Sequence, residues 1–268
     1  MPNLKICLAG ATGWAGSALA RGIARQDDLE LVAAVSRSYA GRRLGAALAD
    51  DAITAPVYKA AAEALELQPC DVFFEYTKPD VAKANVLAAL AHGAHVVVGT
   101  SGLSADDYAE IDAVARAAGR GVLAVGNFAL TVVLLLKFAE AAAKLIPHWE
   151  IIDYSSAGKV DAPSGTGREL AARLGAANQA QHAVPVEQTQ GERAARGATL
   201  GGAQVHSVRL PGYTLSAEVM FGMPDQRLTL RHDAGTSAEP YVDGALLAVR
   251  KVGTLIGVHR GLDVVLDI

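Results

Sequence analysis

Aromatic residues are scarce in this sequence, because Phe, Trp and Tyr together make up 5% of its 268 residues. A buried core must therefore be built mainly from Ala, Val, Leu and Ile. An excess of positive charge is also missing, since 24 Lys and Arg face 28 Asp and Glu. That balance argues against a nucleic-acid partner, which an electrostatic binder would attract with a basic surface. With 51% hydrophobic and 19% charged residues, the chain is not disordered.

Cysteine and targeting segments are scarce as well. The two cysteines, Cys7 and Cys70, both adjoin apolar runs, so we expect small core thiols rather than a disulfide or a metal site. No secretory signal is visible at the N-terminus. The longest apolar stretch, Asn127–Ile146, carries charges at Lys137, Glu140 and Lys144, which are costly inside a bilayer. These features predict a cytoplasmic protein with no metal, no nucleic acid and no membrane contact.

The first half of the sequence alternates short apolar runs with segments of helical spacing. Runs of strand length occur at Leu4–Leu8, Leu31–Val35, Val72–Phe74, His95–Val98 and Val122–Val125. They lack polar alternation, which is typical of parallel strands buried between two helical layers. The pattern predicts an α/β fold with a doubly wound parallel sheet over residues 1–127.

The second half has a different pattern and predicts a second, α+β domain over residues 128–238. We expect helices at Thr131–Leu145 and Gly165–Leu174, and strands at Glu150–Tyr154, Gln204–Arg209, Ser216–Phe221 and Arg227–His232. Polar alternation in these strands favours an antiparallel sheet. Gln188–Gly202 is the expected mobile loop. Residues 239–268 form a C-terminal segment whose helix, Pro240–Ile256, returns to the first domain.

A glycine-rich string follows the first predicted strand and precedes a helix. Its residues are Gly10, Ala11, Thr12, Gly13, Trp14, Ala15 and Gly16. Glycine permits a tight turn and close backbone approach, so a pyrophosphate can rest on the N–H groups that open the helix. This position between strand and helix predicts a dinucleotide site. The alternative is a glycine-rich turn that holds no ligand.

The residues after the second strand should distinguish NADPH from NADH. An acidic residue there would hold the ribose 2′-hydroxyl of NADH, but this sequence has Ser36 and Arg37, with Arg42 and Arg43 close behind. Hydroxyl groups and a guanidinium suit a 2′-phosphate, so we expect NADPH as the preferred cofactor, ahead of NADH. The alternative is that the arginines form a solvated surface.

Three further loops follow later parallel strands and should lie at the same edge of the sheet. Their polar, glycine and aromatic residues are candidates for binding the nicotinamide end of the cofactor. They are Tyr76 and Thr77, then Gly99, Thr100 and Ser101, then Asn127 and Phe128. Taken singly, each loop could equally be a plain turn.

A loop from Asp153 to Thr166 has the composition of a reaction loop. Ser164, Gly165 and Thr166 open a helix whose first N–H groups lack partners, and such an end favours an anion such as a carboxylate. Lys159 lies just upstream and offers a cation or a proton donor. The alternative is an N-capping loop, with Ser164 as the cap and Lys159 as a surface residue.

At this point the sequence resembles a known family. The motifs GATGWAG, GTSG, GNFAL and KVDAPSGT occur in the order found in 4-hydroxy-tetrahydrodipicolinate reductases, also called dihydrodipicolinate reductases. The resemblance implies that residues 1–127 form a Rossmann-like dinucleotide-binding domain, and that residues 128–238 bind the substrate and assemble a homotetramer. It implies NAD(P)H-dependent reduction of a small cyclic dicarboxylate in the diaminopimelate pathway to lysine. It also implies that Lys159 donates a proton and that Gly165 and Thr166 bind a substrate carboxylate.

One departure from the family pattern concerns two adjacent histidines before the lysine, where this sequence has Ser155 and Ser156. Serine cannot supply a proton as imidazole does, but it can hydrogen-bond a substrate or order a water. We therefore retain Ser155 as a catalytic candidate and Ser156, with Ser164, as substrate-binding candidates. A second departure is the segment Asp233–Ser237, which replaces a basic, serine-rich turn. Both changes make the predicted site less cationic.

Three functions remain open at this stage. The first is the reductase of the lysine pathway, working with a water in place of the histidine. The second is a related reductase acting on a different imine or unsaturated acid. The third is an NADP-binding sensor without catalytic activity.

Overall fold

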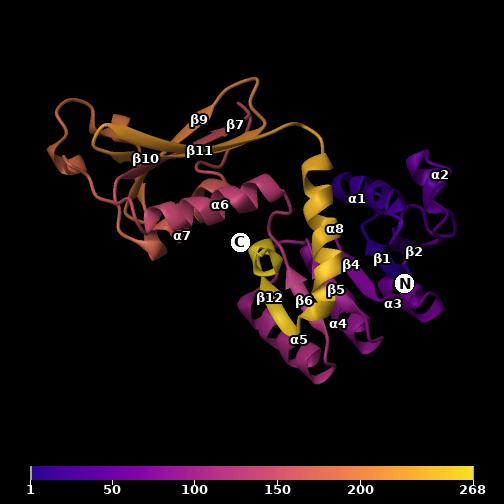
Figure 1. Cartoon of the computed structure of the whole chain (residues 1–268). Helices are drawn as coiled ribbons and strands as arrows, with labels where there is room; N and C mark the ends of the chain where they lie inside the picture. The colour runs from indigo at the N-terminus through magenta and orange to yellow at the C-terminus, as the bar shows by residue number, and fades with distance from the viewer. Residues whose placement is uncertain (1, 268) are drawn as a thin grey trace. The chain divides into compact units, whose positions relative to one another are not determined.

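A computed structural model describes residues 2–267 of the chain, which divides into two compact units. Unit 1 comprises Met1–Leu130 and Ala238–Ile268, and unit 2 comprises Thr131–Ser237. Figure 1 shows the elements of each unit, coloured along the chain. Unit 1 is discontinuous in sequence, since the chain leaves it to build unit 2 and then returns to it.

Unit 1 contains, within the described residues, a seven-stranded parallel sheet in the order β12-β6-β5-β4-β1-β2-β3. The strands are β1 (Leu4–Ala9), β2 (Leu29–Val35), β3 (Val57–Tyr58), β4 (Val72–Glu75), β5 (His95–Val98), β6 (Gly121–Ala124) and β12 (Gly257–Arg260). The strand order reverses between β1 and β4. In open parallel sheets this is the point where ligands bind, at the carboxyl ends of the strands.

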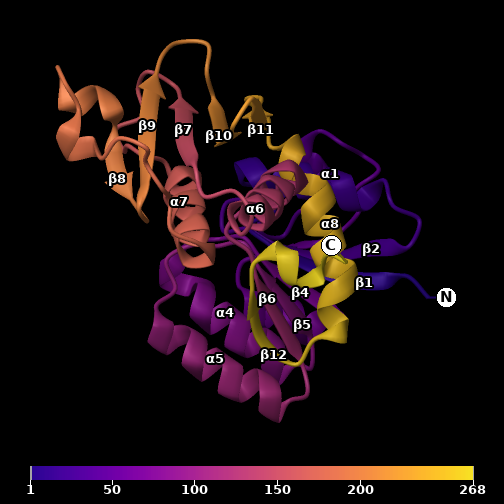
Figure 2. The ribbon, with the colours of Figure 1, turned by 60° about the vertical axis from the view of Figure 1, so that its left-hand side comes forward.

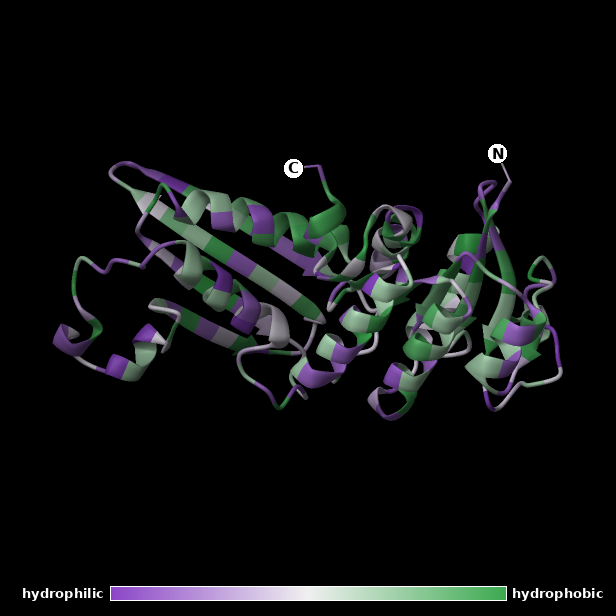
Figure 3. Ribbon diagram, turned by 90° about the horizontal axis from the view of Figure 1, so that it is seen from below, coloured by the Kyte–Doolittle hydropathy of each residue, from purple (hydrophilic) through white to green (hydrophobic). Residues whose placement is uncertain are grey.

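Helices cover both faces of this sheet (Figure 2). One layer consists of α1 (Trp14–Ala24) and α8 (Val242–Lys251), which pack on each other. The other consists of α3 (Ala61–Leu67), α4 (Pro79–Ala91) and α5 (Ala105–Ala117). The short elements are α2 (Leu44–Leu48), η3 (Glu239–Tyr241), η4 (Val252–Thr254) and η5 (Leu262–Val265). The central strands carry mainly hydrophobic residues, whereas the helices mix both kinds (Figure 3).

Unit 2 contains a five-stranded sheet, again within the described part of the chain, in the order β11-β10-β7-β9-β8. The strands are β7 (Trp149–Ser155), β8 (Ala198–Leu200), β9 (Ala203–Arg209), β10 (Leu215–Met223) and β11 (Gln226–Ala234). The helices are α6 (Leu130–Ala143), α7 (Gly165–Ala177), η1 (Val186–Gln188) and η2 (Arg193–Arg196). Buried and half-buried residues alternate along β7, so one face of the sheet is covered.

The sheet of unit 2 is mixed, which corrects the prediction of an antiparallel one. Strands β7 and β9 pair in parallel, while the other neighbours are antiparallel. The reason is the connection: α7 lies between β7 and β9 in the sequence, and a helical crossover returns the chain in the same direction. Alternation of polar and apolar residues indicates that one face of the sheet is covered, but it does not distinguish parallel from antiparallel strands.

Two further segments differ from expectation. The expected loop Gln188–Gly202 contains η2 and the short strand β8. The expected C-terminal helix is shorter, because α8 ends at Lys251 and the chain then enters η4 and strand β12. The long apolar run at 127–146 forms α6, and no helix among residues 2–267 has the length and hydropathy needed to cross a membrane.

Candidate active site

The glycine-rich turn of unit 1 lies where β1 ends and α1 begins. Gly10 has φ +79°, and a Cβ there would lie 2.1 Å from the carbonyl oxygen of Tyr76. A Cβ on Gly16 would lie 2.1 Å from the carbonyl oxygen of Gly10. The turn therefore requires glycine at both positions. The N-cap of α1 is Gly13, which supplies no capping side chain, so the N–H groups of Trp14, Ala15 and Gly16 remain available to a phosphate.

The second strand brings Ser36 next to this turn. The hydroxyls of Thr12 and Ser36 are 2.8 Å apart and form a hydrogen bond. Arg37 follows directly and is exposed. A hydroxyl pair and a free guanidinium at the end of β2 fit the ribose end of a dinucleotide, including one with a 2′-phosphate.

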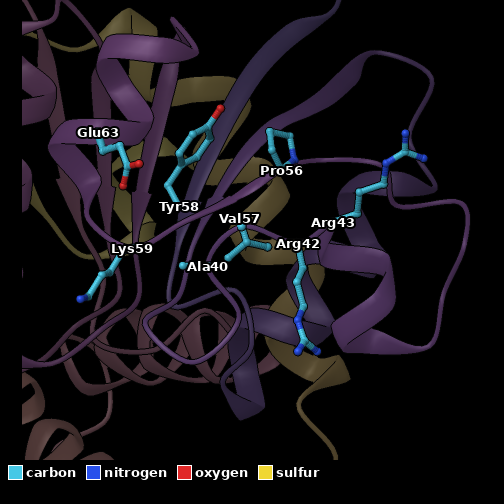
Figure 4. Close-up of a pocket in the computed structure, with 9 residues that line it drawn as sticks. Ala40, Arg42, Arg43, Pro56, Val57, Tyr58, Lys59 and Glu63 are labelled. Atoms are coloured by element: carbon cyan, nitrogen blue, oxygen red, sulfur yellow. The ribbon is translucent and has the colours of Figure 1, made fainter.

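The other two arginines lie farther along, beside edge strand β3. Arg43 forms an isolated bridge with Pro56, and the carbonyl of Arg42 accepts a hydrogen bond from Val57 N. Figure 4 shows both side chains at a cavity of about 330 Å³. Its walls are formed by Ala40, Gly41, Arg42, Arg43, Pro56, Val57, Tyr58, Lys59 and Glu63. Three cations against one carboxylate make this cavity positively charged.

A buried carboxylate connects the loops after β4 and β5. Glu75, at the end of β4, is 0% exposed and accepts hydrogen bonds from Thr77, Asn85 and Thr100. Burial without a cation raises the pKa of Glu75, although these hydrogen bonds oppose the rise. The sequence predicts that the loop containing Glu75 and Thr77 faces the cofactor, but it does not predict that the Glu75 carboxylate accepts hydrogen bonds from Thr77 and Thr100.

A cluster of aromatic rings packs beneath these loops. Phe74, Tyr76 and Phe128 pack with centroid separations of 5.4 to 5.9 Å. Burial, and secondarily Tyr241, raises the pKa of Tyr76 to about 12, so its hydroxyl stays protonated. The ring of Trp14 is 62% exposed and contacts Tyr241 edge-on. Asn127 Oδ1 accepts a hydrogen bond from Ala129 N, which orders the last strand-end loop.

The candidate cofactor residues thus lie at one edge of the unit 1 sheet. Gly99, Thr100 and Ser101 follow β5, while Asn127 and Phe128 follow β6. Because all the strands are parallel, their carboxyl ends meet at this edge. The residues fit a dinucleotide: a backbone cradle that a Cβ would fill, polar groups at the ends of β2 and β4, and a cluster of aromatic rings.

In unit 2 the loop from Asp153 to Thr166, here called the reaction loop, is fixed in place by a buried ion pair. Asp153 is 0% exposed, and its Oδ2 lies 2.8 Å from Nη2 of Arg209. The same Nη2 donates to the carbonyl of Asp161 at 2.7 Å, and Asp153 Oδ2 also accepts from Ser164 N at 2.8 Å. Burial raises the pKa of Asp153, but the hydrogen bonds from Ser164 and Arg209 outweigh it and leave the pKa below its usual value. The pair therefore anchors the loop near both of its ends.

Lys159 is placed at the surface of this loop. Its Nζ forms an ion pair with Asp161 at 2.7 Å, and its side chain is 33% exposed. The hydrogen bond from Lys159 is the largest cause that lowers the pKa of Asp161. Helix α7 begins at Gly165, with the N–H groups of Gly165 and Thr166 in its unpaired first turn. The loop therefore presents an ammonium group and free backbone donors.

Comparison with known proteins agrees with these features. The family model for the N-terminal domain of dihydrodipicolinate reductase matches residues 4–128, and the model for the C-terminal domain matches residues 131–265. The chain belongs to the dihydrodipicolinate reductase family. The resemblance seen in the sequence motifs is thereby confirmed, and the chain is an NAD(P)H-dependent oxidoreductase.

Individual members of the family align over the whole chain. A 4-hydroxy-tetrahydrodipicolinate reductase of Lactococcus lactis subsp. cremoris (strain MG1363) is 37% identical over 99% of this chain and 98% of its own. One from Listeria monocytogenes (strain EGD-e) is 33% identical over 98% and 100%. The dipicolinate-bound dihydrodipicolinate reductase from Paenisporosarcina sp. TG-14 superposes with a TM-score of 0.88 at 27% identity, covering 98% and 100%.

Within this dihydrodipicolinate reductase fold, the neighbouring Ser155 and Ser156 have different surroundings. Ser155 is 1% exposed, and its Oγ donates to the carbonyl of Thr214 at 3.0 Å. Ser156 is exposed at the start of the loop. Ser164 is 1% exposed, and its Oγ accepts from Gly167 N as the N-cap of α7. Of the three hydroxyls, that of Ser156 is the one open to solvent.

Histidine side chains are engaged elsewhere in the structure. Each of the seven, His92, His95, His148, His182, His206, His232 and His259, has a hydrogen-bond partner. His232 bonds Thr131 through Nδ1, while burial lowers its pKa, so it is neutral near pH 7. No three metal-ligating side chains group together within residues 2–267.

Arg209 lies outside the motifs of the sequence, and those motifs assign no partner to Asp153 in unit 2 or to Glu75 in unit 1. Asp153 and Arg209 lie 56 positions apart in the sequence. The sequence does contain a signal for these contacts. Asp153 stands at an inward position of β7, and Glu75 ends the apolar run of β4. A buried carboxylate requires hydrogen-bond or ionic partners, so both positions predict a polar partner elsewhere in the chain.

Proposed function

We propose that this chain reduces 4-hydroxy-tetrahydrodipicolinate, or a small cyclic carboxylate closely related to it, with NADPH as the preferred hydride donor. The observation that carries the proposal is the KVDAPSGT loop, in which Lys159 and the free N–H groups of α7 are held by the buried Asp153–Arg209 pair. The relatives that align with the whole chain are named for this reaction.

In this proposal the two units have separate tasks. The N–H groups of Trp14, Ala15 and Gly16 bind the pyrophosphate, and the loops after β4, β5 and β6 bind the nicotinamide end. The reduced nicotinamide, when bound, supplies a hydride. A substrate carboxylate binds to the N–H groups of Gly165 and Thr166, where the positive end of the helix dipole favours an anion.

Lys159 then completes the reduction. The substrate carbon of a C=N or conjugated C=C bond gains the hydride. The π electron pair of that double bond then moves onto the other atom of the bond. The ammonium group of Lys159 donates a proton there and regains one from solvent. To reach the substrate, Lys159 must break its ion pair with Asp161. The negative charge of the bound substrate replaces that of Asp161 beside the ammonium group. Ser156 hydrogen-bonds the substrate. Ser155 is buried, and its hydrogen bond to the carbonyl of Thr214 holds the start of the reaction loop in position.

Substitution of Lys159 tests this role. Lys159→Ala should lower kcat by about 10²-fold or more, the usual contribution of a positioned proton donor, and leave NADPH affinity unchanged. Lys144→Ala, an exposed lysine of the same unit paired with Glu140, is the matched control. Unchanged turnover in Lys159→Ala contradicts the role.

The wild-type protein also separates the three functions left open by the sequence. Turnover of 4-hydroxy-tetrahydrodipicolinate supports the proposal. Turnover of another imine or unsaturated acid alone identifies a related reductase, and tight NADPH binding without any turnover identifies a sensor.

Cofactor preference is assigned to Arg37. We expect Arg37→Ala to raise the KM for NADPH about tenfold, because a charge-assisted hydrogen bond to the 2′-phosphate is lost, and to leave the KM for NADH unchanged. Arg25→Ala, an exposed arginine of unit 1 paired with Glu239, is the control. Equal effects on both cofactors contradict the assignment.

A homotetramer, implied by the family, is proposed for the assembly. Its support in this chain is a cluster on the unit 2 sheet, made of an exposed arginine and two half-buried tyrosines. Arg231 stacks 4.9 Å from the ring of Tyr154, which lies 5.0 Å from that of Tyr213. Arginine and tyrosine together are typical of subunit interfaces. Light scattering on the purified protein measures the state, and a monomer contradicts the proposal.

A further inference from the structure

The proposed substrate class carries a second carboxylate besides the one placed at the N–H groups of Gly165 and Thr166. Ser155 and Ser156, at the start of the reaction loop, are uncharged, and Lys159 is assigned to proton transfer. Another cation beside the loop is therefore needed for the second carboxylate. We infer that Arg168 is this cation, a specificity-determining residue that binds the second carboxylate of the substrate; the inference rests on the proposed function.

Arg168 lies in the first turn of α7 and folds back over the loop. Its Nη1 donates to the carbonyl of Pro163, and its Nη2 lies 3.8 Å from Oδ2 of Asp161. The other oxygen of that carboxylate, Oδ1, lies 2.7 Å from Nζ of Lys159. The carboxylate of Asp161 thus lies between the proton donor and Arg168, so both cations lie beside the same loop residue.

The guanidinium is available to a ligand. Its side chain is 55% exposed, and a separation of 3.8 Å from Asp161 is longer than the 2.7–2.9 Å typical of a charge-assisted hydrogen bond. Arginine has five N–H donors in a planar fork, so most of them remain for a bidentate carboxylate contact. The next arginine of the helix, Arg173, differs because it pairs with Glu169 at 2.9 Å.

Charge around the loop favours a dianion. Lys159 and Arg168 carry two positive charges against the single negative charge of Asp161, and the N-terminus of α7 adds its partial positive charge. The first carboxylate occupies the N–H groups of Gly165 and Thr166. The second binds the guanidinium of Arg168 in place of Asp161.

Two pyridine carboxylates test the inference on the full-length protein with NADPH bound. Pyridine-2,6-dicarboxylate has both carboxylates, and pyridine-2-carboxylate has one. Arg168→Gln should weaken binding of the dicarboxylate about tenfold or more and change binding of the monocarboxylate less than about twofold. Arg168→Lys should recover part of the loss, and Arg173→Gln should match wild type. For the substrate, KM should rise while kcat stays within about twofold.

The outcomes are distinguishable. Equal weakening of both ligands, or no weakening of the dicarboxylate, overturns the assignment of Arg168. If the wild-type protein binds neither ligand and does not turn over the dicarboxylate substrate, the proposed function itself fails. Melting temperatures of the variants equal to wild type show that the changes in affinity do not arise from unfolding.

Discussion

Removal of Arg209 provides the strongest test of how the reaction loop is built. In Arg209→Met the carboxylate of Asp153 stays buried but loses its cation. It keeps Ser164 N at 2.8 Å and Ser207 Oγ at 3.4 Å, while Oδ1 already has no hydrogen-bond partner among the described residues. The loop also loses the hydrogen bond from Arg209 to the carbonyl of Asp161.

The magnitude follows from burial. The two side chains are 0% and 16% exposed, so solvent screens the pair weakly. Breaking a buried pair by removing one partner costs about 3–5 kcal/mol of unfolding free energy. Asp153→Asn keeps an acceptor for Ser164 and removes the charge, so it should cost about 1–3 kcal/mol. The double variant should cost about 2 kcal/mol less than the sum, because neither charge is left unpaired.

Tryptophan emission isolates the relevant unit. Trp149 is 2% exposed and lies on β7, the strand that carries Asp153, whereas Trp14 belongs to unit 1. In a Trp14→Phe background, urea titration followed by emission therefore reports unfolding of unit 2. Lys144→Met, which breaks an exposed pair with Glu140, is the control and should cost less than about 0.5 kcal/mol. Costs below that value for Arg209→Met, or strictly additive single costs, refute the reasoning.

Three further predictions concern acid stability, the cofactor edge and the phosphate turn. Since the pKa of Asp153 lies below its usual value, its contribution to the stability of unit 2 is present above about pH 4 and is lost as pH falls through the lowered pKa; Asp153→Asn should flatten that part of the unfolding curve against pH. Glu75 has a raised pKa, so its contribution to the stability of unit 1 is full below about pH 4 and declines as pH rises above that value. Glu75→Gln should remove this decline and stabilise unit 1 at pH 7. Trp14 emission in a Trp149→Phe background measures the unfolding of unit 1. Gly16→Ala places a Cβ 2.1 Å from the carbonyl oxygen of Gly10 and should weaken NADPH binding at least about tenfold in a fluorescence titration, whereas Ala15→Gly, which adds no atom, should weaken it less.

In unit 1 the sequence predicts the strands that are buried on both faces and misses the two strands at the edges of the sheet. The run His95–Val98 coincides with β5, and the other central strands of unit 1 differ from prediction by one or two residues. Strand β3 has two residues, and β12 ends in His259 and Arg260, so neither shows an apolar run. Both lie at the edges of the sheet, where one side faces no neighbouring strand.

The candidate site shows the same division between local and distant information. The glycine turn and the KVDAPSGT loop are contiguous, so their spacing alone indicates their chemistry. The contact of Arg209 with Asp153 depends on the parallel pairing of β7 and β9, in which Ser155 lies opposite Arg209. Pairing of strands depends on the crossover through α7, and no local pattern encodes it.

The discontinuity of unit 1 has a consequence for how the chain is made. Strand β12, at 257–260, completes the sheet by pairing with β6, and residues 131–237 are synthesised between the two. A nascent chain that has reached residue 240 contains every strand of the second sheet yet leaves the edge of β6 open. Unit 1 is therefore completed only after unit 2 has been synthesised, and the unpaired edge of β6 stays open to other strands until then.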